Sequence, residues 1–167
     1  MMETIFTRRS IRKYTDEEVA DELITDLLKA GMAAPSAGNA QTWEFVVIDN
    51  QELLNEIPKI HPYSKMVPDA SKAILVCGNT ELELYNGFWP QDCSAATQNI
   101  LLEAEDKGLG AVWLGIYPER ERAQHFKELL NLPEHIAPFA LVPVGYPAVE
   151  KPKADRFKKD KIHYNIW

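Results

Sequence analysis

The sequence is short of cysteine and has no excess of positive charge. Its two cysteines, Cys77 and Cys93, form no metal-binding or redox spacing. We expect both to be free thiols in a reducing compartment, which favours a cytoplasmic location. Acidic residues outnumber basic ones, 25 to 18, so the net charge is −7. This balance excludes the broad basic face that nucleic-acid binding requires.

Long apolar runs and metal-ligand patterns are missing as well. No apolar run approaches the roughly 20 residues of a membrane span. The opening Met1-Met2-Glu3 carries no basic region followed by an apolar stretch, so we expect no secretory signal. The four histidines are scattered, with no pair at helical spacing and no acidic ligand set nearby. Metal binding is therefore not expected.

What is present is an ordinary globular composition, 46% hydrophobic and 26% charged, over 167 residues. This length predicts one domain, residues 1–167, with a substantial core. Apolar periodicity and breaker residues predict interspersed helices and strands with irregular connections, which favours the α+β class. We expect helices at residues 16–33, 50–57, 92–107 and 118–130, and strands at residues 43–49, 72–78, 111–114 and 137–145.

Several local signals sharpen these boundaries. Thr15 and Glu18 form a capping-box pattern at the start of the first long helix. Asp92 is expected to cap the helix that it opens. Pro58 should close the short helix before it, and Pro143 inside the last strand indicates an edge or a bulge.

Three arginines lie close together near the start of this acidic chain, in the run Arg8-Arg9-Ser10-Ile11-Arg12. If the run is helical, Arg8 and Arg12 share a face, and the repulsion between them is better tolerated with an anion between them. Arginine donates in a planar, bidentate way to phosphate, and a serine hydroxyl can complete the shell. The alternative is a solvated basic helix end.

A loop of small residues follows the first predicted helix. Pro35 ends that helix, and Gly38 can adopt a positive φ. Ser36, Asn39 and Gln41 supply short polar groups beside a backbone that a flat ligand can approach closely. The alternative is a plain connection with nothing bound.

The glycines at residues 108–115 resemble a dinucleotide fingerprint, but their order is reversed. Gly108 ends a helix and a strand follows, whereas the fingerprint runs from a strand into a helix. This order argues against a Rossmann turn. Gly115 ends the strand, where bare backbone could lie against a ligand plane.

Two further segments leave alternatives open. The aromatic stretch at residues 81–90, with Tyr85, Phe88 and Trp89, is either a packed loop or a mobile lid over a pocket. The tail at residues 151–167 is basic at first and ends in Ile166 and Trp167. Because exposed apolar residues would be unfavourable, we expect the tail to dock, plausibly on a second copy of the chain.

Five motifs in order along nearly the whole chain resemble the nitroreductase family of flavoproteins. They are residues 8–12, the loop at residues 35–43, the glycines at residues 108–115, residues 143–147, and Arg156-Phe157 with His163-Tyr164. The family loop usually has proline where Thr42 stands, and this departure is expected to loosen the turn slightly.

The resemblance implies a three-layer α+β sandwich with a central, mostly antiparallel sheet flanked by helices. It also implies an intertwined homodimer with an exchanged C-terminal tail and one FMN at each of two sites in the subunit interface. By similarity, Arg8, Ser10 and Arg156 would hold the FMN phosphate, with Arg9 also among the cofactor-binding residues. Arg12 would lie near the flavin N1/C2 carbonyl edge.

The remaining site residues are implied in the same way. Leu114 and Gly115 would give a backbone contact near flavin N5. The partner subunit would contribute the ring contacts from its small-residue loop, at positions Pro35, Ser36, Asn39 and Gln41.

The activity that the resemblance implies is transfer of hydride from NADH or NADPH, through FMN, to a small oxidant such as a nitroaromatic or a quinone. The two substrates would use the same open face in turn, a ping-pong scheme, and no catalytic side chain stands out. Alternatives within the fold are reductive dehalogenation, substrate dehydrogenation, flavin breakdown, or a non-catalytic flavin-binding module. Outside it, residues 8–12 could bind an unrelated phosphorylated ligand.

Overall fold

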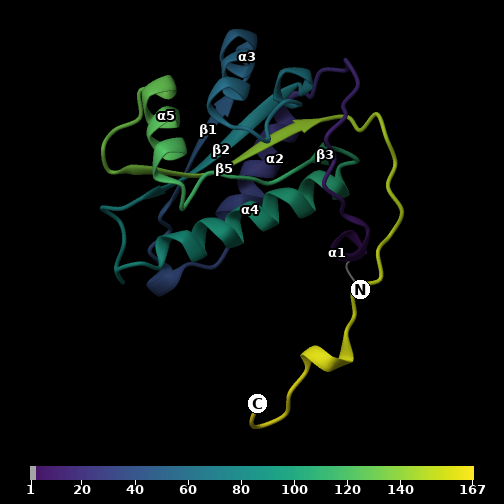
Figure 1. Ribbon diagram of the computed structural model, residues 1–167, viewed down its shortest axis with the longest axis vertical. Helices are drawn as coiled ribbons and strands as arrows, with labels where there is room; N and C mark the ends of the chain where they lie inside the picture. Colours follow the sequence, from purple (N-terminus) through teal and green to yellow (C-terminus); the bar gives the residue numbers. More distant parts are fainter. Residues whose placement is uncertain (1–2) are drawn as a thin grey trace.

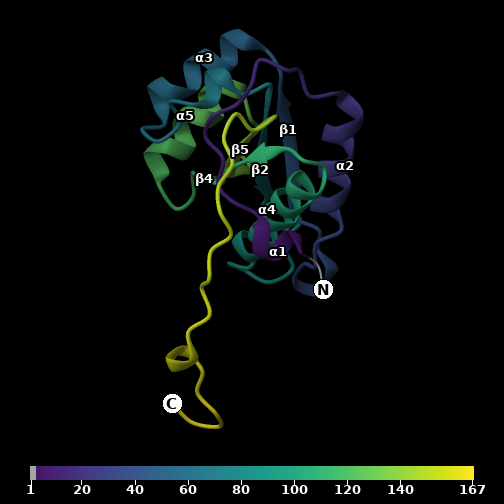
Figure 2. The same cartoon turned by 90° about the vertical axis from the view of Figure 1, so that its right-hand side faces the viewer.

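The protein is a sheet held between two layers of helices, as the computed structural model in Figure 1 shows. It describes residues 3–167, so Met1 and Met2 at the opening of the chain lie outside the described residues. Helices α2 (Asp21–Met32) and α4 (Trp89–Asp106) cover one face of the sheet. Helices α3 (Gln51–Ile60) and α5 (Arg120–Leu130) cover the other (Figures 1 and 2).

The sheet has five strands, and every pairing within it is antiparallel. Its order is β1 (Trp43–Ile48), β2 (Lys72–Asn79), β5 (Ile136–Gly145) and β3 (Gly110–Ala111), with β4 (Leu114–Gly115) also paired to β5. The predicted α+β sandwich with an antiparallel sheet is therefore confirmed.

Alternation along β2 divides the core between the two faces. Ile74 and Val76 pack with α2 and α4, whereas Leu75 and Cys77 pack with α3 and α5. This period of two is what a strand buried on both sides requires. The near-continuous apolar run at residues 72–78 predicted this strand correctly.

Helix α2 begins later than its capping-box pattern predicts. Residues 15–20 are instead held by contacts with distant parts of the chain. The Thr15 N–H donates to the Tyr146 carbonyl (2.9 Å), and the Val19 N–H donates to the Ser71 hydroxyl (2.8 Å). The prediction of a helix from Asp16 was therefore wrong, because these tertiary bonds replace the intrahelical ones.

The predicted helix at residues 92–107 also starts elsewhere, at Trp89. The carboxylate of Glu83 accepts from the N–H groups of Phe88 and Trp89, at 2.7 and 3.0 Å, and so supplies the cap. Asp92 was wrongly predicted as the cap. It lies inside the first turn, is buried, and bonds to another segment described below.

Two proline predictions also need correction. Pro58 lies inside α3, which continues to Ile60. Pro143 lies neither at an edge nor at a bulge, because β5 runs between β2 and the short strands β3 and β4. The gap between those short strands falls opposite Pro143, and the register shift of the sheet occurs at Val76/Cys77.

Short elements complete the chain. Helix α1 (Thr4–Thr7) is a single turn, and the backbone extends from Arg8 onward, so Arg8 and Arg12 do not share a helical face. Three 3-10 turns are present: η1 (Ala37–Asn39), η2 (Val67–Asp69) and η3 (Lys159–Lys161). Among residues 3–167, no helix has both the length and the apolar character to cross a membrane.

Both cysteines are free and buried, as expected. The Cys93 thiol donates to the Cys77 carbonyl at 3.3 Å. Burial raises the pKa of the Cys77 thiol to about 12, so it stays protonated and unreactive at neutral pH.

The tail at residues 151–167 leaves the body of the molecule and runs outward (Figures 1 and 2). Its apolar side chains are exposed, Ile166 by 83% and Trp167 by 98%. Within one chain the tail therefore buries almost none of its apolar surface.

Candidate functional site

Residues 8–12 pass the edge of the sheet at β3, with Arg8 at one end of the segment and Arg12 at the other. Ser10 bridges to Ala111, and the Ile11 N–H donates to the Ala111 carbonyl at 3.0 Å. Two strand glycines permit this close approach. A Cβ at Gly110 would lie 2.7 Å from Ile11, and one at Gly145 would lie 2.9 Å from Tyr14.

A cavity at one end of this segment joins helix α1 to the tail. We call it the arginine pocket; its volume is about 620 Å³. The lining combines two apolar residues of α1 with both arginines that follow them and with the first part of the tail: Ile5, Phe6, Arg8, Arg9, Lys153, Ala154, Asp155, Arg156 and Phe157. The two ends of the chain therefore converge here.

Like charges crowd around Arg8 in this pocket. Partial burial, and then the cations Arg156 and Arg9, lower the pKa of the Arg8 guanidinium, against a smaller opposite effect from Glu105. Bringing cations together costs free energy unless an anion lies between them. The pocket therefore suits a phosphate-sized anion, to which arginine donates in a bidentate way.

The Arg9 side chain donates hydrogen bonds to backbone carbonyl groups. Its Nε donates to the Pro152 carbonyl at 2.8 Å, and its Nη1 donates to the carbonyls of Phe6 (3.1 Å) and Arg8 (2.6 Å). Lys151 adds a bond from its Nζ to the Ser10 carbonyl at 2.7 Å. These ties hold the start of the tail against the N-terminal segment, whereas Ser10 itself lines neither this pocket nor the one described next.

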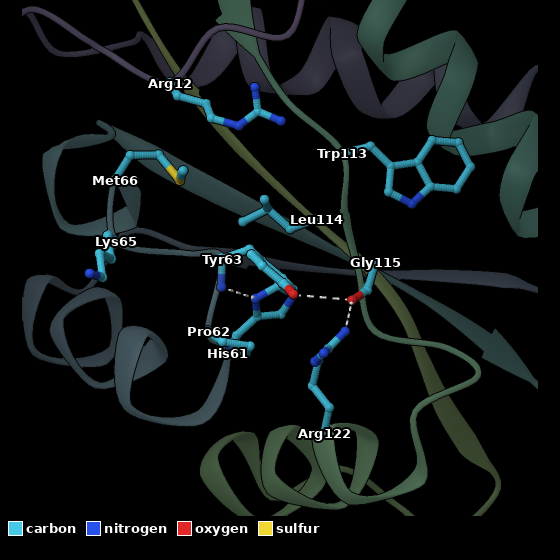
Figure 3. A pocket seen from close by; sticks show the side chains of 10 residues that line it. All are labelled: Arg12, His61, Pro62, Tyr63, Lys65, Met66, Trp113, Leu114, Gly115 and Arg122. Atoms are coloured by element: carbon cyan, nitrogen blue, oxygen red, sulfur yellow. Dashed lines mark hydrogen bonds between the residues drawn. The ribbon is translucent and has the colours of Figure 1, made fainter.

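A second cavity, of about 610 Å³, lies at the other end of the segment, and we call it the Gly115 pocket (Figure 3). It brings together Arg12, Leu114 and Gly115, which the sequence predicted as neighbours. Its lining comes from four parts of the chain: Arg12, His61, Pro62, Tyr63, Lys65, Met66, Trp113, Leu114, Gly115 and Arg122. Three of these residues are cationic and none is acidic, so the pocket favours an electron-rich or anionic ligand.

The carbonyl of Gly115 is held by two donors, and the space beside its Cα is open. This carbonyl accepts from Arg122 Nη1 at 2.6 Å and from His61 Nε2 at 3.0 Å (Figure 3). The Ile116 N–H donates to the Phe139 carbonyl, so by antiparallel alternation Gly115 takes a non-hydrogen-bonded position and its N–H points away from β5. A Cβ on Gly115 would meet no atom within 4 Å, so a flat group could lie there.

His61 is fixed as a neutral donor. The ring is buried (2% exposed), and the Tyr63 N–H donates to Nδ1 at 3.2 Å, which places the ring proton on Nε2. Burial lowers the pKa of His61; the bond to Gly115 acts in the opposite direction, and Arg122 lowers the pKa further. The imidazole therefore stays uncharged at neutral pH.

A buried carboxylate holds the small-residue loop at two points. Asp92 accepts from the Ala37 N–H (2.9 Å) through one oxygen and from the Thr42 hydroxyl (3.0 Å) through the other. Thr42 is fully buried, so it ties the turn down, contrary to the loosening expected from the missing proline. Gly38, Asn39 and Gln41 all adopt positive φ.

This loop does not meet the two pockets within one chain. Pro35, Ser36, Asn39 and Gln41 line neither of them. The loop is bonded to Asp92 at the start of α4, whereas Arg8 lies near Glu105 at its end. At about 1.5 Å of rise per residue, those two helix positions are roughly 20 Å apart. A single protomer therefore leaves the predicted ring contacts separated from the arginines.

Sequence reasoning missed His61, Lys65, Trp113 and Arg122 in the Gly115 pocket. Trp113 lies within the motif at residues 108–115 but was not singled out, and His61, Lys65 and Arg122 belong to no motif. His61 follows α3 and Arg122 lies in α5, and only the packing of these helices on the sheet brings them to Gly115. Trp89, predicted beside a possible lid, is packed edge-on against Tyr117, with ring centroids 4.9 Å apart.

Comparison with known proteins agrees with this architecture. The profile of the nitroreductase family matches residues 5–77 and 86–146. A Methanothermobacter thermautotrophicus protein named "Putative NADH dehydrogenase/NAD(P)H nitroreductase" is 50% identical over 167 residues, which cover 100% of this chain and 87% of the relative.

Solved structures with a similar fold include an FMN-dependent nitroreductase from Clostridium difficile R20291. It is 30% identical, with a TM-score of 0.92 and complete coverage of both chains. The NADPH:FMN oxidoreductase from Vibrio harveyi, complexed with NAD+, is also 30% identical, with a TM-score of 0.86 over 99% of this chain and 77% of that one. The extent of these matches, together with the sheet and the two pockets, establishes that the chain belongs to the nitroreductase family.

Proposed function

We propose that this protein is an FMN-dependent oxidoreductase that passes hydride from NADH or NADPH to a small oxidant such as a nitroaromatic or a quinone. One observation carries the proposal. A short segment, residues 8–12, joins a pocket of crowded arginines to a pocket with an open glycine backbone and a cationic lining. These two environments match the two ends of FMN, a phosphate and a flat ring that gains electrons and negative charge when it is reduced.

The arginine pocket would hold the phosphate. Arg8 and Arg156 come from opposite ends of the chain, and each is a full charge with planar donors. Ser10 would add a hydroxyl nearby. The clamp of Arg9 on Pro152 supports this site indirectly, since it keeps the tail beside Arg8.

The Gly115 pocket would hold the ring. Arg12 would stabilise negative charge that develops on the ring, and Leu114 and Gly115 would present backbone to it. Bound FMN supplies the hydride chemistry itself, and the protein supplies position and electrostatics. The remaining open side of the pocket would admit the nicotinamide and then the oxidant, in a ping-pong order.

A homodimer completes the proposed site. Two features support it: the tail exposes Ile166 and Trp167, and the loop at residues 35–41 is held by Asp92 yet separated from the arginines of its own chain. Residues 1–167 would form one domain, whose tail docks on a second copy and whose loop reaches the ring bound by that copy. The reducing compartment suggested by the free thiols would be the cytoplasm.

Names of relatives support the same cofactor and donors. The Clostridium difficile structure is described as FMN-dependent, and the Vibrio harveyi enzyme as an NADPH:FMN oxidoreductase. The experiment below compares NADH with NADPH as donors and identifies the class of oxidant.

The test starts from purified full-length protein. It should be yellow, or become yellow with added FMN, and it should bleach under anaerobic conditions when NADH or NADPH is added. Steady-state rates with both donors against nitro, quinone and halogenated acceptors would then identify the oxidant class. A colourless protein that does not take up FMN would refute the proposal.

A further inference from the structure

We propose that His61 and Arg122 are positioning residues that hold the Gly115 backbone in the orientation the bound ring requires. The inference rests on the proposed function and adds to it two residues that no motif identifies. Neither side chain has to touch the cofactor, because both act through the Gly115 carbonyl.

The geometry concentrates two donors on one acceptor. A carbonyl oxygen has two lone pairs, and here one is used by Arg122 Nη1 and the other by His61 Nε2. The donors come from different helices of the same layer, α5 and the C-terminal end of α3. The carbonyl is therefore fixed in direction as well as bonded.

The strand that carries Gly115 needs such support. Strand β4 has only two residues, pairs with β5 alone, and follows directly on the interruption of the sheet edge. Glycine also has more backbone freedom than any other residue. Without the two donors, rotation of the peptide after Gly115 would be restrained mainly by the bond from Ile116 to Phe139, at 3.0 Å.

His61 is itself held in the donating form. The Tyr63 N–H occupies Nδ1, and Ser64 bonds to the His61 carbonyl through its hydroxyl at 2.7 Å. The ring of Phe126 packs edge-on against the imidazole, with centroids 6.4 Å apart. A ring this restrained is suited to fixing the direction of its partner.

The consequence concerns the N–H of Gly115. In a strand the N–H and the C=O of one residue point to the same side, so both groups of Gly115 point away from β5. Anchoring the carbonyl there limits the backbone rotations by which the N–H could turn away from the pocket. A donor in that place favours a ring nitrogen with a free lone pair, as in oxidised FMN. Loss of the positioning should therefore weaken oxidised FMN more than reduced FMN.

The experiment uses FMN-loaded full-length protein and five variants. His61→Ala and Arg122→Ala remove each donor, His61→Gln and Arg122→Lys restore a donor, and Arg120→Ala removes an exposed charge from the same helix. The readouts are the Kd for FMN, the midpoint potential, and the ¹H–¹⁵N resonance of the Gly115 amide. Thermal melting identifies any variant that fails to fold.

The expected result is specific to positioning. Both alanine variants should weaken oxidised FMN about 5- to 10-fold more than reduced FMN, since one hydrogen bond is worth about 1 kcal/mol. A tenfold difference raises a two-electron midpoint potential by about 30 mV. The Gly115 amide resonance should shift in both variants, the Gln and Lys variants should recover much of the effect, and Arg120→Ala should match the wild type.

Several results would overturn the inference. If Arg122→Ala lowers the potential, as loss of a cation from this pocket would, while His61→Ala leaves it unchanged, Arg122 acts through its charge alone. If folded alanine variants keep the wild-type potential and amide resonance, Gly115 is positioned without them. If His61→Ala does not fold, the midpoint potentials and Gly115 amide resonances of Arg122→Ala and His61→Gln test the inference in its place. Wild-type protein that binds no FMN refutes the proposed function first, a result distinct from unchanged variants of a yellow wild type.

Discussion

The two pockets at the ends of residues 8–12 are built in opposite ways. In the Gly115 pocket, a buried histidine and a half-buried arginine bond to the same backbone carbonyl, and they come from the end of α3 and from α5. In the arginine pocket, cations outnumber the acidic groups Asp155 and Glu105, and half of the lining comes from a tail that is exposed throughout. The first pocket is supported by the core helices, whereas the second is formed by the N-terminal segment and the tail.

This difference separates two kinds of contribution. Changes in the arginine pocket should alter binding and assembly while leaving the protomer folded, because little of the core depends on it. Changes in the Gly115 pocket should alter the properties of the bound cofactor and, where they reach His61, the stability of the fold. The predictions below test this division, from the largest expected effect to the smallest.

Removing the tail should have the largest effect. A stop codon in place of Ala154 keeps Pro152, and with it the bond from Arg9, but removes Arg156 and the apolar end of the chain. We expect FMN binding to weaken about 100-fold, since charge-assisted bonds of Arg156 are worth about 1.5–3 kcal/mol. Absorbance titration and sedimentation would measure binding and assembly. A truncated protein that remains a yellow dimer would show that the tail has been misplaced.

Arg8→Ala should weaken FMN by about 10- to 30-fold, less than truncation because Arg156 remains. The FMN-free protein should not lose stability, because the substitution relieves the repulsion that lowers the Arg8 pKa. Lys13→Ala is the matched control, an exposed cation five residues along the same segment. Equal losses in the two variants would point to general charge, and a loss for another phosphate ester but not for FMN would point to a different ligand.

Arg12→Ala tests the cationic lining of the Gly115 pocket. Because Arg12 is exposed, its removal should leave the melting temperature nearly unchanged. It should weaken reduced FMN about tenfold more than oxidised FMN and so lower the two-electron midpoint potential by about 30 mV. This shift is opposite in sign to the one expected for His61→Ala. Unchanged potentiometric titrations would contradict the role of Arg12.

The smallest effect is the pH dependence that His61 contributes to stability. Its pKa is lowered in the folded protein, so the unfolded chain binds this proton more readily. The contribution is complete above pH 6.5 and is lost as the pH falls toward the folded pKa. Urea unfolding from pH 8 to 5 should therefore show the wild type losing stability more steeply than His61→Gln. Parallel curves for the two proteins would contradict the neutral, buried state of His61.

The sequence predicted the elements that depend on local pattern and missed those that depend on distant partners. The strand at residues 72–78 and the helix of α4 have strong apolar patterns, and both are present. No helix starts at the capping-box pattern of Thr15, because the Thr15 N–H donates to the Tyr146 carbonyl instead. The Asp92 carboxylate can accept from a backbone N–H as a helix cap would, but it accepts from the Ala37 N–H in the loop.

The candidate site divides in the same way. Arg8 and Arg156 were paired by resemblance, and the structure places both on one cavity. Arg12, Leu114 and Gly115 likewise line one pocket. His61 and Arg122 could not be predicted, because each meets Gly115 through a backbone carbonyl, and a residue type records nothing about which distant carbonyl it will reach.

The close contacts at Gly110 and Gly145 also determine how near the N-terminal segment lies to the sheet. Ile11 and Tyr14 lie where a single methyl group on either glycine would collide with them. How closely residues 11–14 lie against the sheet therefore depends on the missing side chains of Gly110 and Gly145, about 100 and 130 residues further along the chain. A methyl group added to the sheet edge would shift the bridge between the two cavities, although neither glycine need meet a ligand.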